Sequence, residues 1–464
     1  MRLRLCVRMC GGRQMTRLKA AFGLRTEKEL RAGTYKFDGK GELARHRFHL
    51  RVDSRRKGVL MIDASKLLFL NGTALDYVRG LLEGWDEARM AKYMLSRYRK
   101  LDEATARRHY NDLRSQLLGF LRGQADVIKQ TPAETPTIGA DDLPSPYRMD
   151  LALTYRCENS CAHCYNENRA VKELDLAGWL KVIDRTWEIG VPHIVFTGGE
   201  PTLSPHLRQL IARSEEHGQV TGLISNGRKL AKEGYLRDLI AAGLDHAQVT
   251  LLSYRQSVHD ALCGSAGAWK QTVEGIKAAV KEDFYFATNT TILRENYEDL
   301  EETCRFLIGL GVKNIAFNGL IRSGKGKGAR SIAYEELESL LVNIMAMTEE
   351  AGVKLTWYTP TPYCNFNPIN LGLGIKQCTA CSLNMAVEPD GTVLPCQSYY
   401  QSLGNILTDP WDRIWNHELC RRLRSRGYLP EKCRTCNLAD VCGGGCPLAH
   451  EREDYLCLDR HSNM

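Results

Sequence analysis

Three cysteines stand close together in the segment TYRCENSCAHCYNENRA, which covers residues 154–170: Cys157, Cys161 and Cys164. Cysteine thiolates are soft ligands that bind zinc and iron–sulfur clusters. Four thiolates would complete a structural zinc site, whereas three that hold a four-iron cluster leave one iron open to another ligand. The spacing therefore favours an open iron–sulfur site, with a partial zinc site as the alternative.

A second group, of eight cysteines at short spacings, lies near the C-terminus among the nine cysteines of residues 378–464. Its core has the spacing Cys-x2-Cys-x5-Cys-x3-Cys, and the segment VEPDGTVLPC precedes this core. Eight thiolates make two sets of four, so they predict two fully ligated 4Fe–4S clusters, with two structural zinc sites as the alternative. The eight residues are Cys378, Cys381, Cys396, Cys433, Cys436, Cys442, Cys446 and Cys457.

The total cysteine content is high and odd, at 17 in a chain of 464 residues. The basic N-terminus lacks the apolar region of a secretory signal, and no apolar run approaches the roughly 18–20 residues of a membrane helix. In a reducing compartment, cysteines at short regular spacings are typically metal ligands. We therefore expect a cytoplasmic metalloprotein with no membrane segment.

The net charge of +8 is concentrated at the start of the chain, where residues 1–60 hold 17 Lys or Arg against 5 Asp or Glu. A basic arm is typical of proteins that bind nucleic acid or an acidic peptide, and also of a solvated terminal segment. We interpret residues 1–57 as a basic N-terminal segment.

A proline-interrupted linker is expected at residues 129–147, and after it strand patterns alternate with amphipathic helical patterns. Six such units predict an α/β fold with a parallel sheet, a partial (β/α)6 barrel of the TIM type. The cysteine triad follows the first predicted strand, the motif TGGEP follows the second, and the third ends in ISNG. Chemistry in this fold is located at the C-terminal ends of strands, where all three motifs stand. The predicted strands are MDLALTY, HIVFTG, QVTGLIS, HAQVTLL, FYFATNTTI and KNIAFNG.

In this order the motifs resemble the radical S-adenosylmethionine (SAM) family, over a core that we place at residues 148–330. The resemblance implies that Cys157, Cys161 and Cys164 hold a 4Fe–4S cluster whose free iron binds SAM. One-electron cleavage of SAM would then release a 5′-deoxyadenosyl radical. The chain departs from the family at the fourth strand, where Leu252 stands in the place of an Asp that many relatives carry. Contacts to SAM are implied for Gly198, Gly199, Glu200, Ser225 and Asn226.

The C-terminal pattern resembles the SPASM domain of radical SAM enzymes, which we place at residues 378–464 after a bridging region at 331–377. The resemblance implies two auxiliary 4Fe–4S clusters with interleaved ligands, which act as electron relays or as structural supports. Cluster I would take Cys378, Cys381, Cys396 and Cys446, and cluster II would take Cys433, Cys436, Cys442 and Cys457.

A separate N-terminal domain is predicted at residues 58–128. The segment GVLMIDASKLLFLNG predicts two short strands, and three helical patterns follow, with Asp86 and Asp102 at N-cap positions. This winged-helix-like arrangement resembles the PqqD-like domain, also called the RiPP recognition element. The resemblance implies that a leader peptide adds as a strand to the hairpin edge. DNA binding and a purely structural cap are the alternatives.

These resemblances imply a radical SAM/SPASM enzyme, an oxidoreductase that modifies a ribosomally made peptide or protein, for example by a thioether or carbon–carbon crosslink. The implied cofactors are SAM and three 4Fe–4S clusters. The expected partners are a precursor peptide and a reductant such as flavodoxin or ferredoxin, with neither membrane nor nucleic acid. The alternatives are a radical SAM enzyme for a small molecule such as a tetrapyrrole, and a DNA-binding Fe–S sensor. The sequence identifies no catalytic acid or base beyond the cluster ligands.

Overall fold

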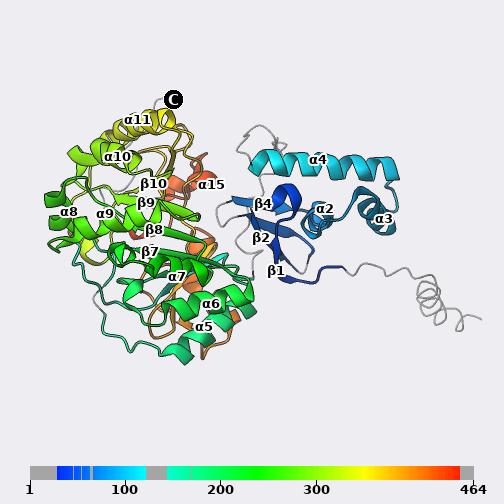
Figure 1. The fold of residues 1–464 in the computed structure, drawn as a ribbon, viewed down its shortest axis with the longest axis horizontal. Coiled ribbons are helices and arrows are strands. Elements are labelled where there is room, and N and C mark those ends of the chain that lie inside the picture. Colours follow the sequence, from blue (N-terminus) through cyan, green and yellow to red (C-terminus); the bar gives the residue numbers. More distant parts are fainter. Residues whose placement is uncertain are drawn as a thin grey trace, which may run out of the picture. The chain divides into compact units, whose positions relative to one another are not determined.

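The computed structural model describes residues 29–44, 46–53, 55–62, 66–121, 144–167 and 169–449. They form two compact units, one built mostly from residues before the linker and the other mostly from residues after it (Figure 1). Cys457 and the linker at 129–143 lie outside the described residues.

The N-terminal domain contains a four-stranded sheet with the order β1-β2-β3-β4, followed by three helices. The predicted hairpin and the three predicted helices are confirmed. The first two strands, however, fall in residues that we interpreted as a basic segment. The elements are β1 (Gly33–Asp38), η1 (Gly41–Leu43), β2 (Arg47–Val52), β3 (Gly58–Ile62), β4 (Lys66–Leu70), α2 (Gly72–Glu83), α3 (Glu87–Arg97) and α4 (Glu103–Leu121).

Local side-chain chemistry explains where these helices begin and end. Asn71 accepts a hydrogen bond from the backbone of Ala74 at the start of α2, and Asp86 does the same for Arg89 at the start of α3. Asp102 accepts a 2.8 Å bond from the backbone N–H of Thr105, which is the bond of an N-cap. Both predicted Asp caps are therefore confirmed.

The second unit is built around a sheet with the strand order β11-β10-β9-β8-β7-β6-β5-β12-β13-β14. The six predicted strands are β5 to β10, and each pairs with the next in parallel. The predicted α/β class with a barrel-type parallel sheet is confirmed. These strands are β5 (Arg148–Ala152), β6 (His193–Thr197), β7 (Val220–Ser225), β8 (His246–Thr250), β9 (Tyr285–Thr291) and β10 (Asn314–Asn318).

Helices pack on the outer face of this sheet, and the core lies between the two layers (Figure 1). Trp179 and Val182 of α5, for example, are buried in the same core as Ile194 and Phe196 of β6. The helical elements of this part are α5 (Leu176–Glu188), η3 (Pro201–Leu203), α6 (Leu207–His217), η4 (Arg228–Ala231), α7 (Tyr235–Ala241), α8 (Gln256–Cys263), α9 (Ala268–Ala279), η5 (Tyr297–Asp299), α10 (Leu300–Gly309), η6 (Gly324–Lys327) and α11 (Tyr334–Glu350).

The C-terminal region is joined to the barrel sheet through its own strands. Strand β12 pairs in parallel with β5, so that Asn384 lies opposite Arg148 and Val387 opposite Leu151. The end of β12 therefore lies beside the start of the cysteine loop. The remaining elements are β11 (Lys354–Trp357), β12 (Asn384–Val387), β13 (Thr392–Leu394), β14 (Gly404–Asn405), α12 (Trp411–Trp415), α13 (Glu418–Arg424), α14 (Glu431–Arg434), α15 (Ala439–Cys442) and η7 (Pro447–Ala449).

Candidate active site

The cysteine loop leaves the end of β5 and is fixed at once to the TGGE turn that follows β6. The backbone N–H of Gly199 donates to the carbonyl of Thr154 at 2.7 Å, and that of Glu200 donates to the carbonyl of Arg156 at 2.9 Å. A Cβ atom on Gly199 would lie 2.3 Å from the Arg156 carbonyl oxygen. The two glycines of the motif are therefore required for the close approach of the two loops.

The middle of the cysteine loop is held by the C-terminal end of α8. Ser160 N–H donates to the carbonyl of Cys263 at 2.8 Å, and Ala162 N–H donates to the carbonyl of Leu262 at 2.9 Å. Gly264 has a φ of 60°, and a Cβ there would lie 2.8 Å from the Ser160 carbonyl oxygen. The end of α8 is thus shaped to receive this loop.

A third contact comes from the glycine-rich loop after β10, which the sequence analysis did not single out. Lys325 Nζ donates to Ser160 Oγ at 2.7 Å, and Gly326 N–H donates to the carbonyl of Cys164 at 3.3 Å. A Cβ on Gly324 would lie 2.4 Å from the Asn166 carbonyl oxygen. The sequence SGKGKG thus permits close backbone contact and places one cation beside the cysteines.

The three thiols lie near one another, with Cys157 exposed and Cys161 and Cys164 partly buried. Burial raises the pKa of Cys157 to about 12, and burial also raises the pKa of Cys164. A hydrogen bond with Cys263, and then burial, raise the pKa of Cys161, while the charge of Lys325 opposes the rise. In the part of the chain that the structure describes, no group of three or more Cys, His, Asp or Glu side chains is arranged to hold a metal ion. Three soft sulfur donors on one loop nevertheless form a donor set that suits an iron–sulfur cluster.

Glu200 organises the loop after β7 rather than facing outward. It is fully buried and accepts hydrogen bonds from the Thr202 backbone and hydroxyl, the Ser225 hydroxyl and the Asn226 backbone. Burial raises the pKa of its carboxyl group, and these hydrogen bonds oppose the rise. The structure therefore brings Gly198, Gly199, Glu200, Ser225 and Asn226 together at adjacent strand ends.

Asn226 and Arg228 connect this group to the cysteine loop. Asn226 Nδ2 donates to Glu158 Oε2 at 3.1 Å. Arg228, which the sequence analysis missed, donates to Asn159 Oδ1 at 2.7 Å and to Ser265 Oγ at 3.0 Å. The only feature of the sequence that could have pointed to Arg228 is its position two residues after Asn226. Arg228 therefore joins the cysteine loop, the β7 loop and the segment after α8.

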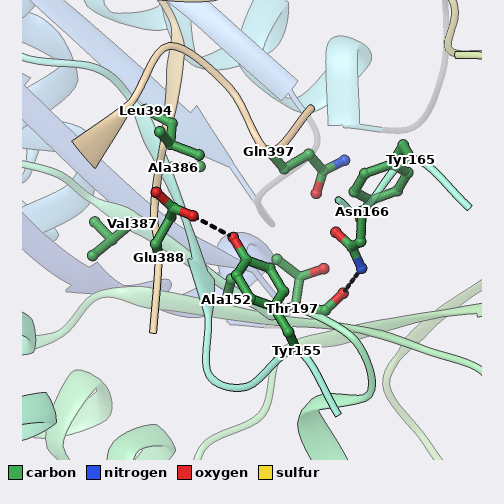
Figure 2. Close-up of a pocket in the computed structure, with 11 residues that line it drawn as sticks. Ala152, Tyr155, Tyr165, Asn166, Thr197, Ala386, Val387, Glu388, Leu394 and Gln397 are labelled. Atoms are coloured by element: carbon green, nitrogen blue, oxygen red, sulfur yellow. Dashed lines mark hydrogen bonds between the residues drawn. The ribbon is translucent and has the colours of Figure 1, made fainter. Parts of the chain in front are cut away.

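A small cavity lies where the cysteine loop meets the C-terminal region (Figure 2). Its volume of about 10 Å³ is room for about one water molecule. Tyr165, directly after Cys164, and Gln397, directly after Cys396, both line it, and Gln397 Oε1 is buried without a hydrogen-bond partner. The residues that follow Cys164 and Cys396 in the sequence therefore line the same small cavity.

A buried carboxylate, that of Glu388, joins the cysteine loop to the C-terminal region. Glu388 accepts two hydrogen bonds from Arg169, at 2.6 and 2.7 Å, and one of 2.8 Å from the Tyr155 hydroxyl. Asn166 Nδ2 donates to the Gly198 carbonyl at 2.6 Å and its Oδ1 accepts from the Tyr400 hydroxyl at 3.0 Å. Figure 2 shows Glu388, just after β12, and Tyr155 pointing toward each other, with Asn166 also at the cavity.

The described C-terminal cysteines fall into two groups by electrostatic interaction. Burial raises the pKa of Cys378, and the neighbouring Cys446 and Cys396 add to the rise. Burial also raises the pKa of Cys433, with further contributions from its neighbours Cys442 and Cys436. The groups are thus Cys378, Cys396 and Cys446 on one side and Cys433, Cys436 and Cys442 on the other.

Cys381 differs from its expected role as a ligand of cluster I. Its sulfur is bonded to that of Cys420 in α13, and both residues are fully buried. A sulfur in a disulfide is not a thiolate and does not bind a metal in that state. The spacing Cys-x2-Cys suggested a ligand pair because spacing does not show the direction of a side chain.

Two protein-family models match the regions that contain these residues. Residues 151–307 match the model of the radical SAM superfamily, and residues 378–437 match that of the SPASM iron–sulfur cluster-binding domain. The first match begins within β5 and contains the cysteine triad and the TGGE and SNG loops, and the second begins at Cys378.

The chain contains a radical SAM domain and a SPASM domain.

Among its relatives is the antilisterial bacteriocin subtilosin biosynthesis protein AlbA of Bacillus subtilis, 24% identical over 408 residues, covering 85% of this chain and 88% of that protein. The AdoMet-dependent heme synthase of Methanosarcina barkeri is 27% identical over 318 residues, covering 65% of this chain and 91% of that protein. The crystal structure of Streptococcus suis SuiB bound to precursor peptide SuiA shares the fold, with a TM-score of 0.65, 16% identity, and coverage of 88% of this chain and 97% of that chain.

The radical SAM enzyme therefore takes SAM and 4Fe–4S clusters as cofactors. None of the helices in the described residues is both long and apolar enough to span a membrane.

Proposed function

We propose that this radical SAM enzyme modifies a ribosomally made peptide or protein, forming an oxidative crosslink such as a thioether or carbon–carbon bond. The observation that carries the proposal is the extent of the match to AlbA, a bacteriocin biosynthesis protein. The barrel and the SPASM domain, residues 148–464, are too short to account for a match that covers 85% of the chain. The similarity to AlbA therefore extends into the N-terminal domain. The match to the heme synthase covers 65% of the chain, which the barrel and SPASM domain alone can supply.

In this proposal Cys157, Cys161 and Cys164 hold the SAM-binding cluster. When bound, the cluster and SAM supply one-electron cleavage of SAM and a carbon radical that abstracts hydrogen from the substrate. Gly198 and Gly199 allow the backbone of the TGGE turn to approach the cofactor closely.

The surrounding residues fix the shape of this site. Glu200 holds Ser225 and Asn226 in position through its four hydrogen bonds. Arg228 ties the cysteine loop to the β7 loop. Lys325 supplies a positive charge beside the cysteine triad, which offsets the negative charge of its thiolates.

The two C-terminal groups of thiols would hold the auxiliary clusters. Cys378, Cys396 and Cys446 supply cluster I, and Cys433, Cys436 and Cys442, with Cys457, supply cluster II. An oxidative crosslink removes two hydrogens from the substrate, and an auxiliary cluster can accept the second electron. Tyr165 and Gln397, which directly follow Cys164 and Cys396, line the same small cavity, and this supports the role of cluster I as the electron acceptor.

The N-terminal domain would bind the leader part of the precursor, as a PqqD-like recognition element. Strand β4 lies at one end of the sheet order, so one of its edges is unpaired among the described strands. Phe69 of β4 is 39% exposed. An extended peptide can add to such an edge through backbone hydrogen bonds, and pockets for alternate side chains supply specificity.

The proposal is tested by anaerobic incubation of the reconstituted enzyme with SAM, a reductant such as flavodoxin or ferredoxin, and peptides encoded beside its gene. We expect a loss of two mass units per crosslink, together with 5′-deoxyadenosine. A parallel enzyme that lacks residues 1–130 should retain its clusters and uncoupled SAM cleavage but modify the full precursor poorly. Adding the N-terminal domain as a separate chain should partly restore turnover. Equal modification by the truncated enzyme would remove the peptide-recognition role.

A small-molecule substrate such as a tetrapyrrole is the second candidate, because the heme synthase is a relative at 27% identity. This candidate predicts turnover of a tetrapyrrole by the enzyme with and without residues 1–130, and no mass change in any neighbouring peptide.

A further inference from the structure

A cavity of about 450 Å³ opens on the N-terminal domain, among its three helices. It is lined by Thr73 and Tyr77 of α2, by residues 97–101 between α3 and α4, and by His109 of α4. All of these residues belong to the same compact unit. None of its lining residues belongs to the cysteine loops described above.

The rim of this cavity carries positive charge that the domain does not neutralise. Arg97 is paired with Asp76 at 3.1 Å and with Glu29 at 2.8 Å. Arg99 and Lys100 are exposed, and neither makes an ion pair or hydrogen bond with a residue of the described chain. Two free cations therefore face the cavity.

The acidic groups near this cavity are already engaged. Asp76 is 3% exposed and accepts hydrogen bonds from Arg56, Tyr93 and Tyr98. Glu29 is bound by Arg97. Neither carboxylate is available to Arg99 or Lys100, so the rim is suited to a carboxylate from another chain.

One residue that lines the cavity, Tyr77, carries a buried hydroxyl group without a hydrogen-bond partner. The residue as a whole is 3% exposed. Its ring packs edge-on against that of His109, with 6.2 Å between the centroids. A buried hydroxyl without a partner costs about 1–3 kcal/mol, and an acceptor atom from a ligand would remove that cost.

We propose that this cavity binds an Asp or Glu side chain of the peptide that the enzyme modifies, between Arg99, Lys100 and the Tyr77 hydroxyl. The inference rests on the proposed function. It adds a second binding site for the peptide, specific for a carboxylate, in addition to the β4 edge. Nucleic acid is disfavoured, because most other arginines of this domain are paired with acids, for example Arg79 with Glu83 and Arg114 with Glu42. Two free cations fall short of the several phosphate contacts that duplex binding requires.

The test uses the full-length, cluster-loaded protein and a displayed library of random 12-residue peptides. We expect selection on the wild-type protein to enrich Asp or Glu at one fixed position. A fluorescent copy of a selected peptide should bind at least about tenfold more weakly to the Arg99→Gln/Lys100→Gln protein, or when its acid is changed to the amide. The control Lys92→Gln/Arg108→Gln removes the same charge from exposed positions outside the cavity and should stay within about twofold of wild type.

A Tyr77→Phe protein distinguishes binding from folding. It should bind the acidic peptide several-fold more weakly while its melting temperature is unchanged or raised, because the unpaired hydroxyl is removed. Selection without acidic enrichment, or equal binding by the Arg99→Gln/Lys100→Gln protein, would overturn the proposal. Binding of a 20-base-pair DNA duplex that depends on Arg99 and Lys100, without acidic-peptide binding, would also overturn it. Because binding is measured without turnover, failure to modify any peptide would count against the proposed function alone.

Discussion

Lys325 Nζ donates a hydrogen bond of 2.7 Å to the hydroxyl of Ser160, which stands between the first two cysteines of the triad. The charge of Lys325 also lowers the pKa of Cys161 and Cys164, against the larger effects that raise it. A loop 165 residues further along the chain thus supplies the counter-charge of the site.

Replacing Lys325 with Met should make the midpoint potential of the SAM-binding cluster more negative, on the order of tens of millivolts. A nearby positive charge favours the reduced cluster, which is more negative by one unit, so its loss favours the oxidised form. A redox titration followed by electron paramagnetic resonance measures the shift. The control is Lys327→Met on the same loop, whose ammonium lies 3.6 Å from Glu167, and it should shift the potential less. Equal shifts in both proteins would contradict the role of Lys325.

Replacing Cys161 with Ala should abolish formation of 5′-deoxyadenosine and leave roughly two thirds of the iron, since only one of three clusters is lost. Cys263 provides the matched control because it is a buried thiol hydrogen-bonded to Cys161 and to His259. Cys263→Ala should retain the full iron content and SAM cleavage. Iron loss in Cys263→Ala, with none in Cys161→Ala, would show that the triad is assigned to the wrong thiols.

The reconstituted wild-type protein should contain about twelve irons, and Cys396→Ser should remove about a third of them. Cys381→Ser and Cys420→Ser should both retain the iron, because the structure pairs these two sulfurs with each other. Metal analysis by mass spectrometry tests all four proteins. Iron loss in Cys381→Ser equal to that in Cys396→Ser would restore the ligand role that the family resemblance implied. Iron near four, together with bound zinc, would remove both auxiliary clusters.

Replacing Glu200 with Gln should weaken SAM binding at least about tenfold while leaving the iron content unchanged. The amide would present a donor to Thr202, Ser225 or Asn226, all of which donate to the carboxylate. Equilibrium dialysis with labelled SAM measures the affinity. Glu188→Gln is the control, because Glu188 is 60% exposed and pairs only with Arg185 on the surface of α5. SAM affinity equal to that of the control would mean that Glu200 does not shape the site.

The fold of the barrel could be predicted because its strands are short apolar runs separated by amphipathic helices. All six strands from β5 to β10 fall where those runs stand. Strands β1 and β2 were missed because GTYKFD and RFHLRV are interrupted by charged residues inside a basic region. In the sheet β1 pairs with β2 and β2 pairs with β3, and local composition does not show this pairing.

The candidate site could be predicted only where the chemistry is local in sequence. Cys157, Cys161 and Cys164 are marked by their spacing, and Glu200 by the glycines before it. Lys325 was not predicted because SGKGKG has the composition of an ordinary flexible loop, and its function arises from contact with a distant segment. The structure pairs Cys381 with Cys420, which could not be predicted because spacing carries no information about the direction of a side chain.

The most direct test of the central claim is transfer of deuterium from the peptide to 5′-deoxyadenosine. The enzyme is incubated anaerobically with SAM, reductant and a precursor peptide whose carbon-bound hydrogens are replaced by deuterium, and the 5′-deoxyadenosine is analysed by mass spectrometry. If the radical abstracts hydrogen from the peptide, the product should gain one mass unit in step with the appearance of modified peptide. Unlabelled 5′-deoxyadenosine, in an amount that does not change when the peptide is present, would contradict the account.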